Sequence, residues 1–345
     1  MPCRTRPTGE FLREVLLKMG IKIRGTGSYA PDKILTNVDL EKMVETNDEW
    51  IRTRTGICQR HIAAPEQACS DLAEKAARAA LDMAGVAPED VNAIIVATIS
   101  PDHVFPSTAC LLQHRLGAKN AFGFDLEAAC SGLLFALETA RGLMTVNSKY
   151  RYVLVIGAEK LSSIVNWEDR NTCVLFGDGA SALLLENCPD EEDCFLASEM
   201  GVDGNSLDIL SLPAGGSRNP ASVQTVTDKL HYIHMAGRDV FKLAVNAMVS
   251  SCKKVLEEAN VSIDQVRWLI PHQANERIMK AVAQRLPMEE ERVFMNIGKY
   301  GNTSAASIGI CIDEMKRSGQ VNPGDYVLLT AFGGGLTWGA ILIKW

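Results

Sequence analysis

The stretch Leu126-Glu-Ala-Ala-Cys-Ser-Gly-Leu-Leu-Phe135 joins a predicted strand to a predicted helix through one cysteine. Residues 121–126 are typical of a buried strand, and from Leu133 onward apolar residues recur at helical spacing. Cys130 therefore falls at the turn into the helix, where unpaired N–H groups favour an anion and are expected to lower the pKa of the thiol toward neutrality. The alternative is a small buried hydrophobe, because free cysteines are among the most buried residues.

The helix–strand units around this stretch occur twice in the chain. Residues 70–84 and 240–259 each predict a helix that is followed by a buried strand, and the two units align without a gap at an offset of 175. A second pair of strands, at residues 152–155 and 326–329, repeats at an offset of 174. A shift this constant predicts an internal repeat, with an α/β fold of two related halves in packed layers.

The repeat divides the chain into an N-terminal half, residues 19–190, which carries the cysteine, and a C-terminal half, residues 191–345. Residues 187–229 are rich in Asp, Gly, Ser and Pro and are interpreted as the connecting region. Residues 1–18 contain arginines and glutamates but no sustained apolar run, so they make a poor signal peptide. We expect them to be an extension whose deletion leaves activity intact.

Composition and charge narrow the classes of function. A chain of 345 residues with 47% hydrophobic and 22% charged residues is ordinary for a globular protein, and its net charge of −7 argues against nucleic-acid binding. No apolar run approaches the ~20 residues that span a membrane. The ten cysteines include no CxxC pair and no metal-ligand spacing. We therefore expect a reduced, cytoplasmic protein with no metal site and no membrane or nucleic-acid partner.

The repeat also brings three polar side chains to one place. His272 lies just beyond the end of the strand that matches residues 91–98. At an offset of 174 Cys130 matches Ser304, so Asn302 stands just before the corresponding helix. Because ligand sites in open α/β sheets lie at the carboxyl ends of strands, we expect Cys130, His272 and Asn302 to converge on one cleft. Two alternatives stay open: a lone histidine is usually structural or exposed, and the asparagine is equally well read as a helix N-cap.

A glycine-rich segment, Phe332-Gly-Gly-Gly-Leu-Thr-Trp-Gly339, stands near the C-terminus. It lacks the Gly-Lys-Ser/Thr of a phosphate loop and the GxGxxG that opens a nucleotide-binding helix. Glycines here would let backbone N–H groups approach a reacting carbonyl, as an oxyanion hole requires. The alternative is a tight turn between strands at 326–330 and 340–343. Phe176-Gly-Asp-Gly-Ala180 is the counterpart of this segment in the first half.

Seven motifs occur together in residues 19–345: Gly25-Thr-Gly-Ser-Tyr29, Asp48-Glu-Trp-Ile-Arg-Thr-Arg-Thr-Gly56, Ala128-Ala-Cys-Ser-Gly132, Phe176-Gly-Asp-Gly179, Pro271-His-Gln-Ala-Asn275, Gly301-Asn-Thr-Ser-Ala305 and Phe332-Gly-Gly-Gly335. In combination they resemble the motifs of β-ketoacyl-acyl-carrier-protein synthase III, a condensing enzyme of the thiolase superfamily that begins bacterial fatty-acid chains. The resemblance implies a duplicated thiolase-like fold with five layers, αβαβα, and a homodimer.

The resemblance also implies a reaction in two halves. The Cys130 thiolate takes the acyl group of acetyl-CoA or another short acyl-CoA and releases CoA, while the N–H groups of Cys130 and Gly334 hold the oxyanion. Malonyl-acyl-carrier protein then loses CO2, and its carbanion attacks the acyl group to give a 3-ketoacyl product. His272 and Asn302 would stabilise the charge on the malonyl thioester oxygen, and Phe332 would surround the carboxylate with apolar atoms. We expect no cofactor, because acyl-CoA is a substrate.

Binding residues are carried over by the same resemblance. Trp50 and Arg170 would sandwich the CoA adenine, and Phe105 would close the acyl pocket and favour a short primer. The acyl carrier protein is acidic and would dock on basic side chains, although a solvated helix face is the commoner meaning of such charges. Arg238 departs from the pattern, because some relatives carry Asn there. The other implied CoA contacts are Thr46, Arg54, Gly237 and Asn275, and the implied docking residues are Lys242, Arg277, Lys280 and Arg285.

Other classes fit the sequence less well. A degradative thiolase would carry a second cysteine in its C-terminal glycine motif, and elongating synthases have a second histidine where this chain has Asn302. A papain-like hydrolase also uses Cys, His and Asn in that order, but on a chain without this duplication. An inactive partner subunit would be expected to have lost Cys130 or His272. A relative that makes a secondary metabolite from other acyl-CoAs remains an alternative, and the preferred primer stays open.

Overall fold

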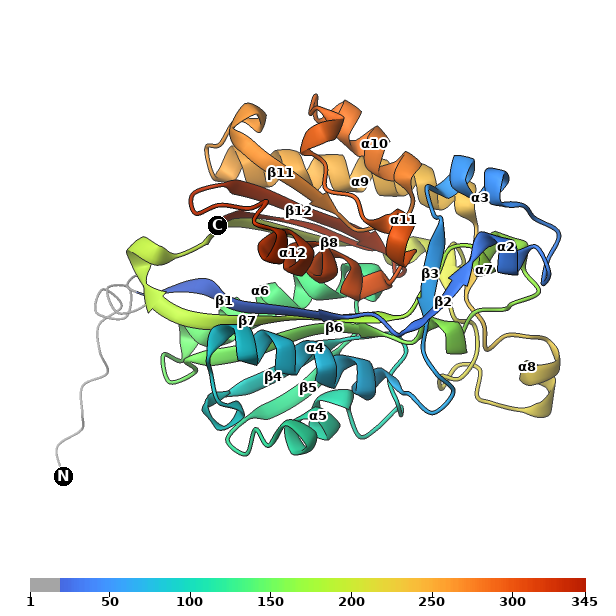
Figure 1. Ribbon diagram of the computed structural model, residues 1–345, viewed down its shortest axis with the longest axis horizontal. Helices are drawn as coiled ribbons and strands as arrows, with labels where there is room; N and C mark the ends of the chain where they lie inside the picture. Colours follow the sequence, from blue (N-terminus) through green and yellow to red (C-terminus); the bar gives the residue numbers. More distant parts are fainter. Residues whose placement is uncertain (1–18) are drawn as a thin grey trace.

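The central strands of the first sheet are almost wholly apolar. The computed structural model describes residues 19–345, and the predicted extension, residues 1–18, lies outside them. The sheet contains Met19–Tyr29 (β1), Ala93–Ala97 (β4), Phe122–Leu126 (β5), Tyr152–Glu159 (β6) and Gly179–Pro189 (β7). Its order is β1-β7-β6-β4-β5, and β4 is parallel to both of its neighbours (Figure 1). β4 and β6 are buried along their whole length, as expected for strands covered on both faces.

β5 lies at the edge of this sheet and is not the buried strand that the sequence predicts. Its side chains are partly or largely exposed, with Phe122 at 40%. An edge strand lacks a neighbour on one side, and a short apolar run does not reveal whether its strand is central or marginal.

The second sheet is formed by Phe195–Val202 (β8), Val266–Pro271 (β11), Tyr326–Gly333 (β12) and Thr337–Lys344 (β13). Its order is β11-β12-β13-β8, and β11 and β12 are its parallel pair. The glycine-rich segment forms the turn between β12 and β13. β8 belongs to the stretch that was interpreted as a connecting region, together with Leu210–Ser211 (β9) and Val223–Thr227 (α8). That interpretation is wrong for β8, because Ser and Glu interrupt its apolar pattern and hide the strand.

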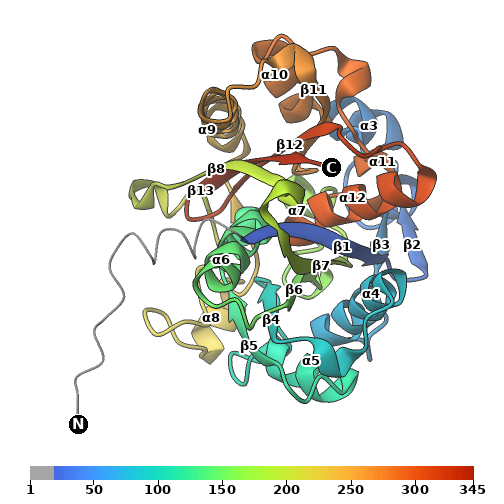
Figure 2. The same cartoon turned by 90° about the vertical axis from the view of Figure 1, so that its left-hand side faces the viewer.

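Helices fill the three remaining layers (Figure 2). Cys69–Ala84 (α4) and Thr108–Leu116 (α5) cover the outer face of the first sheet, and Gly237–Glu258 (α9) and Glu276–Arg285 (α10) cover the outer face of the second. Gly132–Val146 (α6) and Ser307–Ser318 (α12) lie between the sheets, where their apolar side chains form one core with both. The order αβαβα confirms the predicted five-layered fold.

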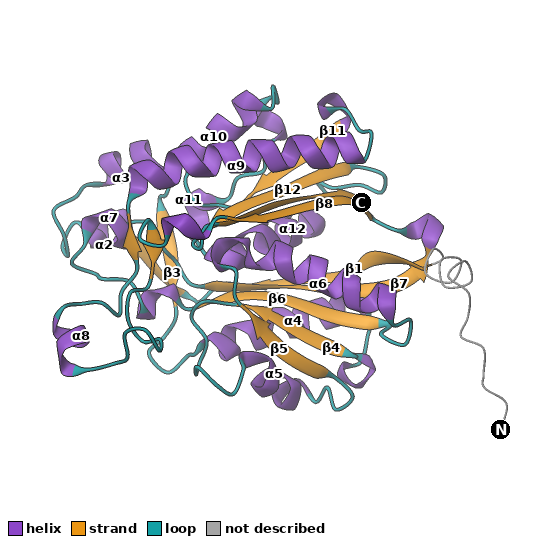
Figure 3. Cartoon of the chain, turned by 180° about the vertical axis from the view of Figure 1, so that it is seen from behind, coloured by secondary structure: helices purple, strands orange, loops and turns teal. Residues whose placement is uncertain are grey.

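Several short elements gather at one end of the molecule, on the left in Figure 3. Asn37–Leu40 (α2), Asp48–Thr55 (α3) and Arg170–Cys173 (α7) lie there with α8. Nearby, Lys33–Thr36 (β2) and Gln59–Ile62 (β3) pair as an antiparallel two-stranded sheet. The other short elements are His234–Met235 (β10), which pairs with β9, and Ile297–Tyr300 (α11).

The two central helices begin in the same way. A 3-10 turn over Ala129–Ser131 leads into α6, and one over Ser304–Ala306 leads into α12. The first residue of each turn has a positive φ angle, 45° and 48° respectively. Equivalent positions here therefore differ by 175, so Cys130 corresponds to Ala305 and not, as the offset of 174 predicts, to Ser304. The offset of 174 holds for β6 and β12, which begin at Tyr152 and Tyr326, but it does not extend across the turn.

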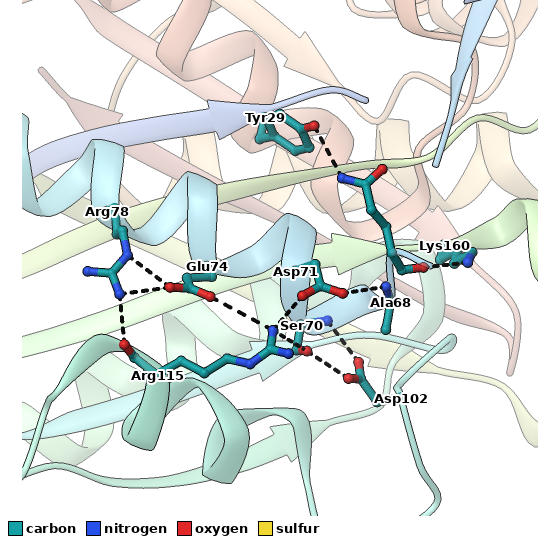
Figure 4. A network of polar contacts seen from close by, with 10 residues as sticks. Tyr29, Ala68, Ser70, Asp71, Glu74, Arg78, Asp102, Arg115 and Lys160 are labelled. Atoms are coloured by element: carbon teal, nitrogen blue, oxygen red, sulfur yellow. Dashed lines mark hydrogen bonds and ion pairs between the residues drawn. The ribbon is translucent and has the colours of Figure 1, made fainter. Parts of the chain in front are cut away.

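A polar network anchors the loop that follows β4 (Figure 4). Ser70 of α4 donates from its backbone N–H and its hydroxyl to the two carboxylate oxygens of Asp102, over 2.8 and 2.7 Å. Arg115 of α5 donates to the Ser70 hydroxyl over 2.9 Å and to Asp71 over 2.7 Å. The loop is thereby tied to both outer helices of the first sheet, and this anchoring positions several residues of the central cavity.

Candidate active site

A cavity of about 1350 Å³ lies where the two halves of the chain meet. Its lining includes Cys130 from the turn before α6, His272 from the end of β11 and Asn302 from the turn before α12. The three side chains therefore converge on one cavity from the equivalent ends of two related halves. The rest of the lining is mostly apolar, as in a pocket that surrounds a reacting group.

The turn that carries Cys130 is packed directly against the glycine-rich segment. A Cβ atom on Gly333 would come within 2.6 Å of the Cys130 backbone nitrogen, so any larger residue there would displace the turn. Two hydrogen bonds join the same segments: the Ser131 hydroxyl donates to the Thr337 carbonyl over 3.1 Å, and the Thr337 hydroxyl donates to the Ala128 carbonyl over 2.9 Å. The position of the cysteine is thus set by residues of both halves.

The thiol of Cys130 is buried, and its protonation differs from the sequence prediction. Burial raises the pKa of Cys130 to about 12, with a further contribution from the Glu159 carboxylate, whereas the Ser304 hydroxyl lowers it. The predicted fall toward neutrality rests on the start of α6, but removal of the sulfur from water outweighs any such effect in the free protein. Burial therefore favours the neutral thiol of Cys130 in the free protein.

His272 is held by α12 and by the second sheet. Its backbone N–H donates to the Thr330 carbonyl over 2.7 Å, and its Nδ1 lies 2.7 Å from the hydroxyl of Ser307, the first residue of α12. Burial lowers the pKa of His272 to about 3, so the ring is neutral. Because Nδ1 is occupied by Ser307, Nε2 is the ring nitrogen left to face the cavity.

The Asn302 side chain bonds to the backbone two residues ahead and still presents a donor. The side-chain oxygen of Asn302 accepts the Ser304 backbone N–H over 2.9 Å. The backbone N–H of Asn302 donates to the Leu175 carbonyl over 2.9 Å. The first bond orients the amide, because the side-chain oxygen is engaged by the turn and the NH2 group is left for the cavity. The N-cap alternative is wrong, because Thr303 is the N-cap residue of the turn that begins at Ser304, and Asn302 lies one residue earlier.

Phe332 and Gly334 complete the part of the cavity around the cysteine. Both line it, and Phe332 is buried at the end of β12. A Cβ atom on Gly334 would lie 2.9 Å from the Leu210 carbonyl oxygen, so the backbone approaches the neighbouring loop more closely than a side chain would permit.

Known proteins are similar to this chain in sequence. Residues 124–204 match the family described as 3-oxoacyl-[acyl-carrier-protein (ACP)] synthase III, and residues 256–345 match its C-terminal part. A beta-ketoacyl-[acyl-carrier-protein] synthase III of Desulfitobacterium hafniense is 53% identical over 328 residues, which are 95% of this chain and 98% of that protein. The chain belongs to the β-ketoacyl-acyl-carrier-protein synthase III family.

Solved structures agree with this assignment. The 3-oxoacyl-[acyl-carrier-protein] synthase III of Aquifex aeolicus VF5 is 48% identical, with a TM-score of 0.87 over 94% of this chain and 100% of that chain. A priming β-ketosynthase from the R1128 polyketide biosynthetic pathway is 33% identical, with a TM-score of 0.86 over 95% of this chain and 97% of that chain. The chain is an acyltransferase with the thiolase-like fold.

The structure brings together Trp50 and Arg170, which are distant in sequence. The Arg170 guanidinium carbon lies 5.2 Å from the centre of the Trp50 ring, and its Nη1 donates to the Glu45 carbonyl over 3.0 Å. A flat base between the two would need two contact distances of about 3.5 Å each, so this pair is too close to sandwich an adenine as it stands. Arg170 must therefore move before the predicted sandwich can form.

Only some of the other implied CoA contacts line the cavity. Arg54, Gly237, Asn275 and the divergent Arg238 line the cavity, and the Asn275 side chain donates to the Arg54 carbonyl over 3.1 Å. Thr46 does not line it, although its hydroxyl is buried and has no hydrogen-bond partner among the described residues.

Phe105 lies outside the cavity of its own chain. It is 84% exposed and is absent from the lining of its own chain's cavity, whereas its neighbour Val104 lines the cavity at the edge and is 92% exposed. Ser107 caps α5 directly after this loop, and the loop tip turns outward before that cap. Phe105 therefore does not close the acyl pocket of the same chain.

The four implied docking residues differ in whether their side chains are already paired within the chain. Lys280 forms ion pairs with Glu276 and Glu290, over 3.0 and 3.3 Å, so its charge is largely neutralised. Arg285 donates to the Asn246 side chain. Lys242 and Arg277 are exposed beside the cavity mouth, and Arg277 lies 5.9 Å from the Phe241 ring. Of the four, these two are the best placed to meet an acidic partner.

Three residues of the site have no role in the sequence analysis. Ser307 holds the His272 ring, Ser304 lines the cavity beside the cysteine, and Glu159 lies behind Ser304 at the end of β6. Ser304 lies within the motif Gly301-Asn-Thr-Ser-Ala305, and Glu159 is a lone acidic residue at the end of an otherwise apolar strand. Such a residue is a signal that sequence reasoning could have used, because a buried carboxylate is costly without a function.

Residues 19–345 contain no helix that is long and apolar enough to cross a membrane. The same residues contain no group of three or more His, Cys, Asp or Glu side chains that could hold a metal ion. Their nine cysteines are all free thiols.

Proposed function

We propose that the chain performs its condensation in the cavity of Cys130, His272 and Asn302. As a member of its family it initiates fatty-acid synthesis by condensing an acyl-CoA with malonyl-acyl-carrier protein. The observation that carries the residue assignment is the convergence of a buried thiol, a neutral imidazole and an oriented amide on one cavity. This set supplies one nucleophile and two hydrogen-bond donors, which the two half-reactions require.

In the first half-reaction the Cys130 sulfur attacks the thioester carbonyl of an acyl-CoA, with acetyl-CoA as the proposed primer. A thioester forms on the cysteine, and CoA leaves as the thiolate. The N–H groups of Cys130 and Gly334 stabilise the tetrahedral oxyanion, and one such donor is typically worth about 3–4 kcal/mol in the transition state. The packing of Gly333 against the cysteine turn supports this role, because it holds the two segments at a fixed separation.

In the second half-reaction malonyl-acyl-carrier protein loses CO2, and its α-carbon attacks the acyl group on Cys130. The charge moves onto the malonyl thioester oxygen, where His272 Nε2–H and the Asn302 amide donate hydrogen bonds. A neutral imidazole donates this bond when its one N–H is on Nε2, and the Ser307 hydroxyl at Nδ1 is placed to favour that tautomer. Phe332 surrounds the carboxylate with apolar atoms, which favours its departure as neutral CO2. This chemistry draws on no cofactor beyond the acyl-CoA substrate.

The CoA moiety is proposed to lie along Arg54, Gly237 and Asn275, with Thr46 beside it. Its adenine stacks on Trp50 after Arg170 moves outward. The guanidinium already rests on the indole, which supports the pairing, because cations and flat bases both favour the face of an indole ring.

The acyl carrier protein is proposed to dock at Lys242 and Arg277, with Lys280 and Arg285 at the margin. The exposure of the first two beside the cavity supports this, because a net-negative enzyme needs a local basic patch for an acidic partner. We place the protein in the cytoplasm, which the free cysteines support. We divide its halves at residue 190, between the strands of the first sheet and those of the second.

We propose a homodimer that covers the β5 edge. Phe122 on this edge is 40% exposed, and the loop before α5 exposes Phe105 at 84%. Apolar groups exposed in this way on a single chain are suited to a contact with a second copy. If Phe105 closes an acyl pocket, as the resemblance implies, its exposure assigns that pocket to the second copy.

The test combines radiolabelled acetyl-CoA, purified malonyl-acyl-carrier protein and a Cys130→Ser variant. We expect acetoacetyl-carrier protein from the wild type and none from the variant. Wild type that is acylated but gives no product with malonyl-carrier protein would indicate a specialised condensing enzyme with another second substrate. Wild type that no short acyl-CoA acylates would overturn Cys130 as the nucleophile for this class of primer.

A further inference from the structure

Arg60 is a buried cation that the proposed mechanism leaves without a role. It lies on β3, is fully buried and does not line the cavity. Its guanidinium donates to the Leu35 carbonyl over 3.2 Å, to the Asn37 side-chain oxygen over 2.9 Å and to the Val174 carbonyl over 2.7 Å. These partners within the described chain are neutral oxygens, and none is a carboxylate. A charge buried without a counter-ion is costly to the fold, so it is a candidate for a role beyond stability.

The bond to Val174 reaches a segment that forms part of the cavity wall. Residues 174–176 follow α7, and all three are buried and line the cavity. The other two bonds of the guanidinium go to Leu35 on β2 and to Asn37 at the start of α2. Arg60 therefore fastens this part of the wall to the two-stranded sheet of β2 and β3.

The same segment holds the backbone of Asn302 on both sides. The Asn302 N–H donates to the Leu175 carbonyl over 2.9 Å, and the Gly177 N–H donates to the Asn302 carbonyl over 3.0 Å. Phe176 and Asn302 thereby form an isolated parallel bridge. The side-chain oxygen of Asn302 is engaged by the Ser304 N–H, so the NH2 group points where this backbone directs it. The segment bonded to Arg60 is thus the one that places the proposed donor.

Arg60 also packs directly against the residues beside this bridge. A Cβ atom on Gly177 would come within 2.9 Å of the Arg60 Cβ. A Cβ atom on Gly301, which directly precedes Asn302 and has a φ angle of 67°, would lie 3.1 Å from the Arg60 Cβ and 3.0 Å from the Leu175 carbonyl oxygen. Contacts this close leave no room for the segment and the Asn302 turn to shift independently of Arg60.

Other bonds keep the segment in the fold when the bond from Arg60 is lost. The Leu175 N–H donates to the Thr172 carbonyl of α7 over 3.0 Å, and the Asp178 N–H donates to the His61 carbonyl of β3 over 2.9 Å. The segment is therefore held at both ends. We expect loss of the guanidinium to displace it rather than to unfold it.

We propose that Arg60 is a positioning residue for Asn302, and that its bond to the Val174 carbonyl holds the segment that places the Asn302 amide for decarboxylation. The inference rests on the proposed role of Asn302 as a donor to the malonyl thioester oxygen. Burial lowers the pKa of Arg60 to about 10, which leaves the guanidinium charged at neutral pH. A charged donor makes a stronger hydrogen bond than a neutral one, which suits a residue that fixes a backbone.

Acylation does not depend on this arrangement. The turn of Cys130 is fixed by the glycine-rich segment, through the bonds of Ser131 and Thr337. The proposal therefore predicts that a change at Arg60 slows one half-reaction and leaves the other alone. A general loss of structure would slow both.

The test measures the two half-reactions separately in Arg60→Met and Arg60→Lys. Methionine fills much of the space without a donor, whereas lysine keeps the charge but lacks the planar fork that bonds on two sides. Release of CO2 from radiolabelled malonyl-carrier protein should fall about 100-fold in Arg60→Met and about tenfold in Arg60→Lys, because a small misplacement of a catalytic group is enough for such losses. Acylation of Cys130 by saturating radiolabelled acetyl-CoA should be unchanged.

Saturation matters because the second arm of Arg60 leads toward the proposed CoA site. Asn37 accepts from Arg60 and donates to Asp48 of α3 over 2.8 Å, and α3 also carries Trp50. A shift along this path would act on KM for acetyl-CoA. The acylation rate at saturation is free of that effect.

Arg292→Met is the matched control. The Arg292 guanidinium also donates to backbone carbonyls, those of Ile263, Asp264 and Val266, but it does not line the cavity. Its replacement should slow neither half-reaction.

A double variant shows whether Arg60 acts through Asn302. Asn302→Ala alone should slow CO2 release about 100- to 1,000-fold, as expected for one oxyanion donor. Addition of Arg60→Met should then cause no further loss, because both changes remove the same interaction. A merely structural role of Arg60 would multiply the two losses.

Each outcome decides the proposal. Multiplied losses in the double variant, equal losses in both half-reactions, or slower CO2 release in Arg292→Met overturn it. Arg60→Met that releases CO2 at the wild-type rate overturns it as well. If Arg60→Met does not fold in a thermal melt, Arg60→Lys decides through the same combination. Asn302→Ala that releases CO2 at the wild-type rate refutes the proposed role of Asn302 itself, which is a distinct result.

Discussion

Replacement of Ser307 by alanine tests how the His272 ring is held. The Ser307 hydroxyl lies 2.7 Å from His272 Nδ1, and it also accepts the Gln273 N–H over 3.3 Å. A neutral imidazole carries one N–H, and the proposed decarboxylation needs it on Nε2. The serine must then donate to Nδ1, which keeps the proton on the other nitrogen. Ser307→Ala removes this constraint from a residue that is 2% exposed, so no bulk water replaces the lost donor.

The structure brackets the size of the effect. A neutral hydrogen bond is worth about 1 kcal/mol net, which sets the lower bound at about fivefold. Complete loss of one oxyanion donor costs about 100- to 1,000-fold, which sets the upper bound. The ring retains its backbone anchor at Thr330, so we expect the condensation rate to fall about 10- to 100-fold, or about 1.4–2.7 kcal/mol.

The two half-reactions are measured separately. Acylation of Cys130 is followed by rapid quench with radiolabelled acetyl-CoA, and decarboxylation by release of CO2 from malonyl-carrier protein. We expect Ser307→Ala to slow only the second. Ser251→Ala, which removes another buried helix hydroxyl that donates to the Ala247 carbonyl over 3.0 Å, is the matched control and should slow neither. Equal loss in both half-reactions, or a further loss when Ser307→Ala is added to His272→Ala, would refute the reasoning.

Three further predictions concern binding and stability. Trp50→Ala should raise KM for acetyl-CoA about tenfold with kcat nearly unchanged. The reason is that stacking far from the reacting carbon stabilises the bound ground state and the transition state equally. A fall in kcat alone would contradict this. Arg277→Glu should raise KM for malonyl-carrier protein and leave acylation of Cys130 unchanged, and the rise in KM should be smaller at high salt. The control is Lys149→Glu, a charge reversal at an exposed lysine, which should change neither KM nor acylation. The Glu159 pKa is raised from 4.5 to about 7, so the folded state binds this proton more tightly than the unfolded state. Its contribution to stability is complete below about pH 4.5 and is lost as pH rises through 7, by up to about 3 kcal/mol, and urea unfolding of Glu159→Gln should lack that slope.

The sequence was sufficient for the parts of the site that follow from periodicity. The offset of 175 places His272 beyond one strand of a repeated unit, and the motif around Cys130 marks the start of a helix. Both positions follow from local patterns, because strand ends and helix starts are written in neighbouring residues. The repeat predicts two related α/β halves in packed layers, and the number of five layers comes from the resemblance to the family.

Other features depend on tertiary contacts that no local pattern carries. The pKa of Cys130 is set by how completely the fold removes the sulfur from water, which a helix start alone does not reveal. The outward loop at Phe105 and the marginal position of β5 depend on which surfaces remain uncovered in a single chain. Glu159 could be recognised as unusual from its apolar strand, but its neighbours on the loop after β4 become visible only in the structure.

The duplication itself accounts for the meeting of the two turns at the cavity. The two 3-10 turns occupy equivalent positions, with φ angles of 45° and 48° on their first residues, and they pack against each other. In a fully symmetric pair each turn would present the same side chain to the other. In this chain one turn carries a thiol at its second residue, Cys130, and the other carries a hydroxyl at its first residue, Ser304. A symmetric backbone therefore brings the two turns together, and the difference in sequence between them leaves the thiol on only one of the two.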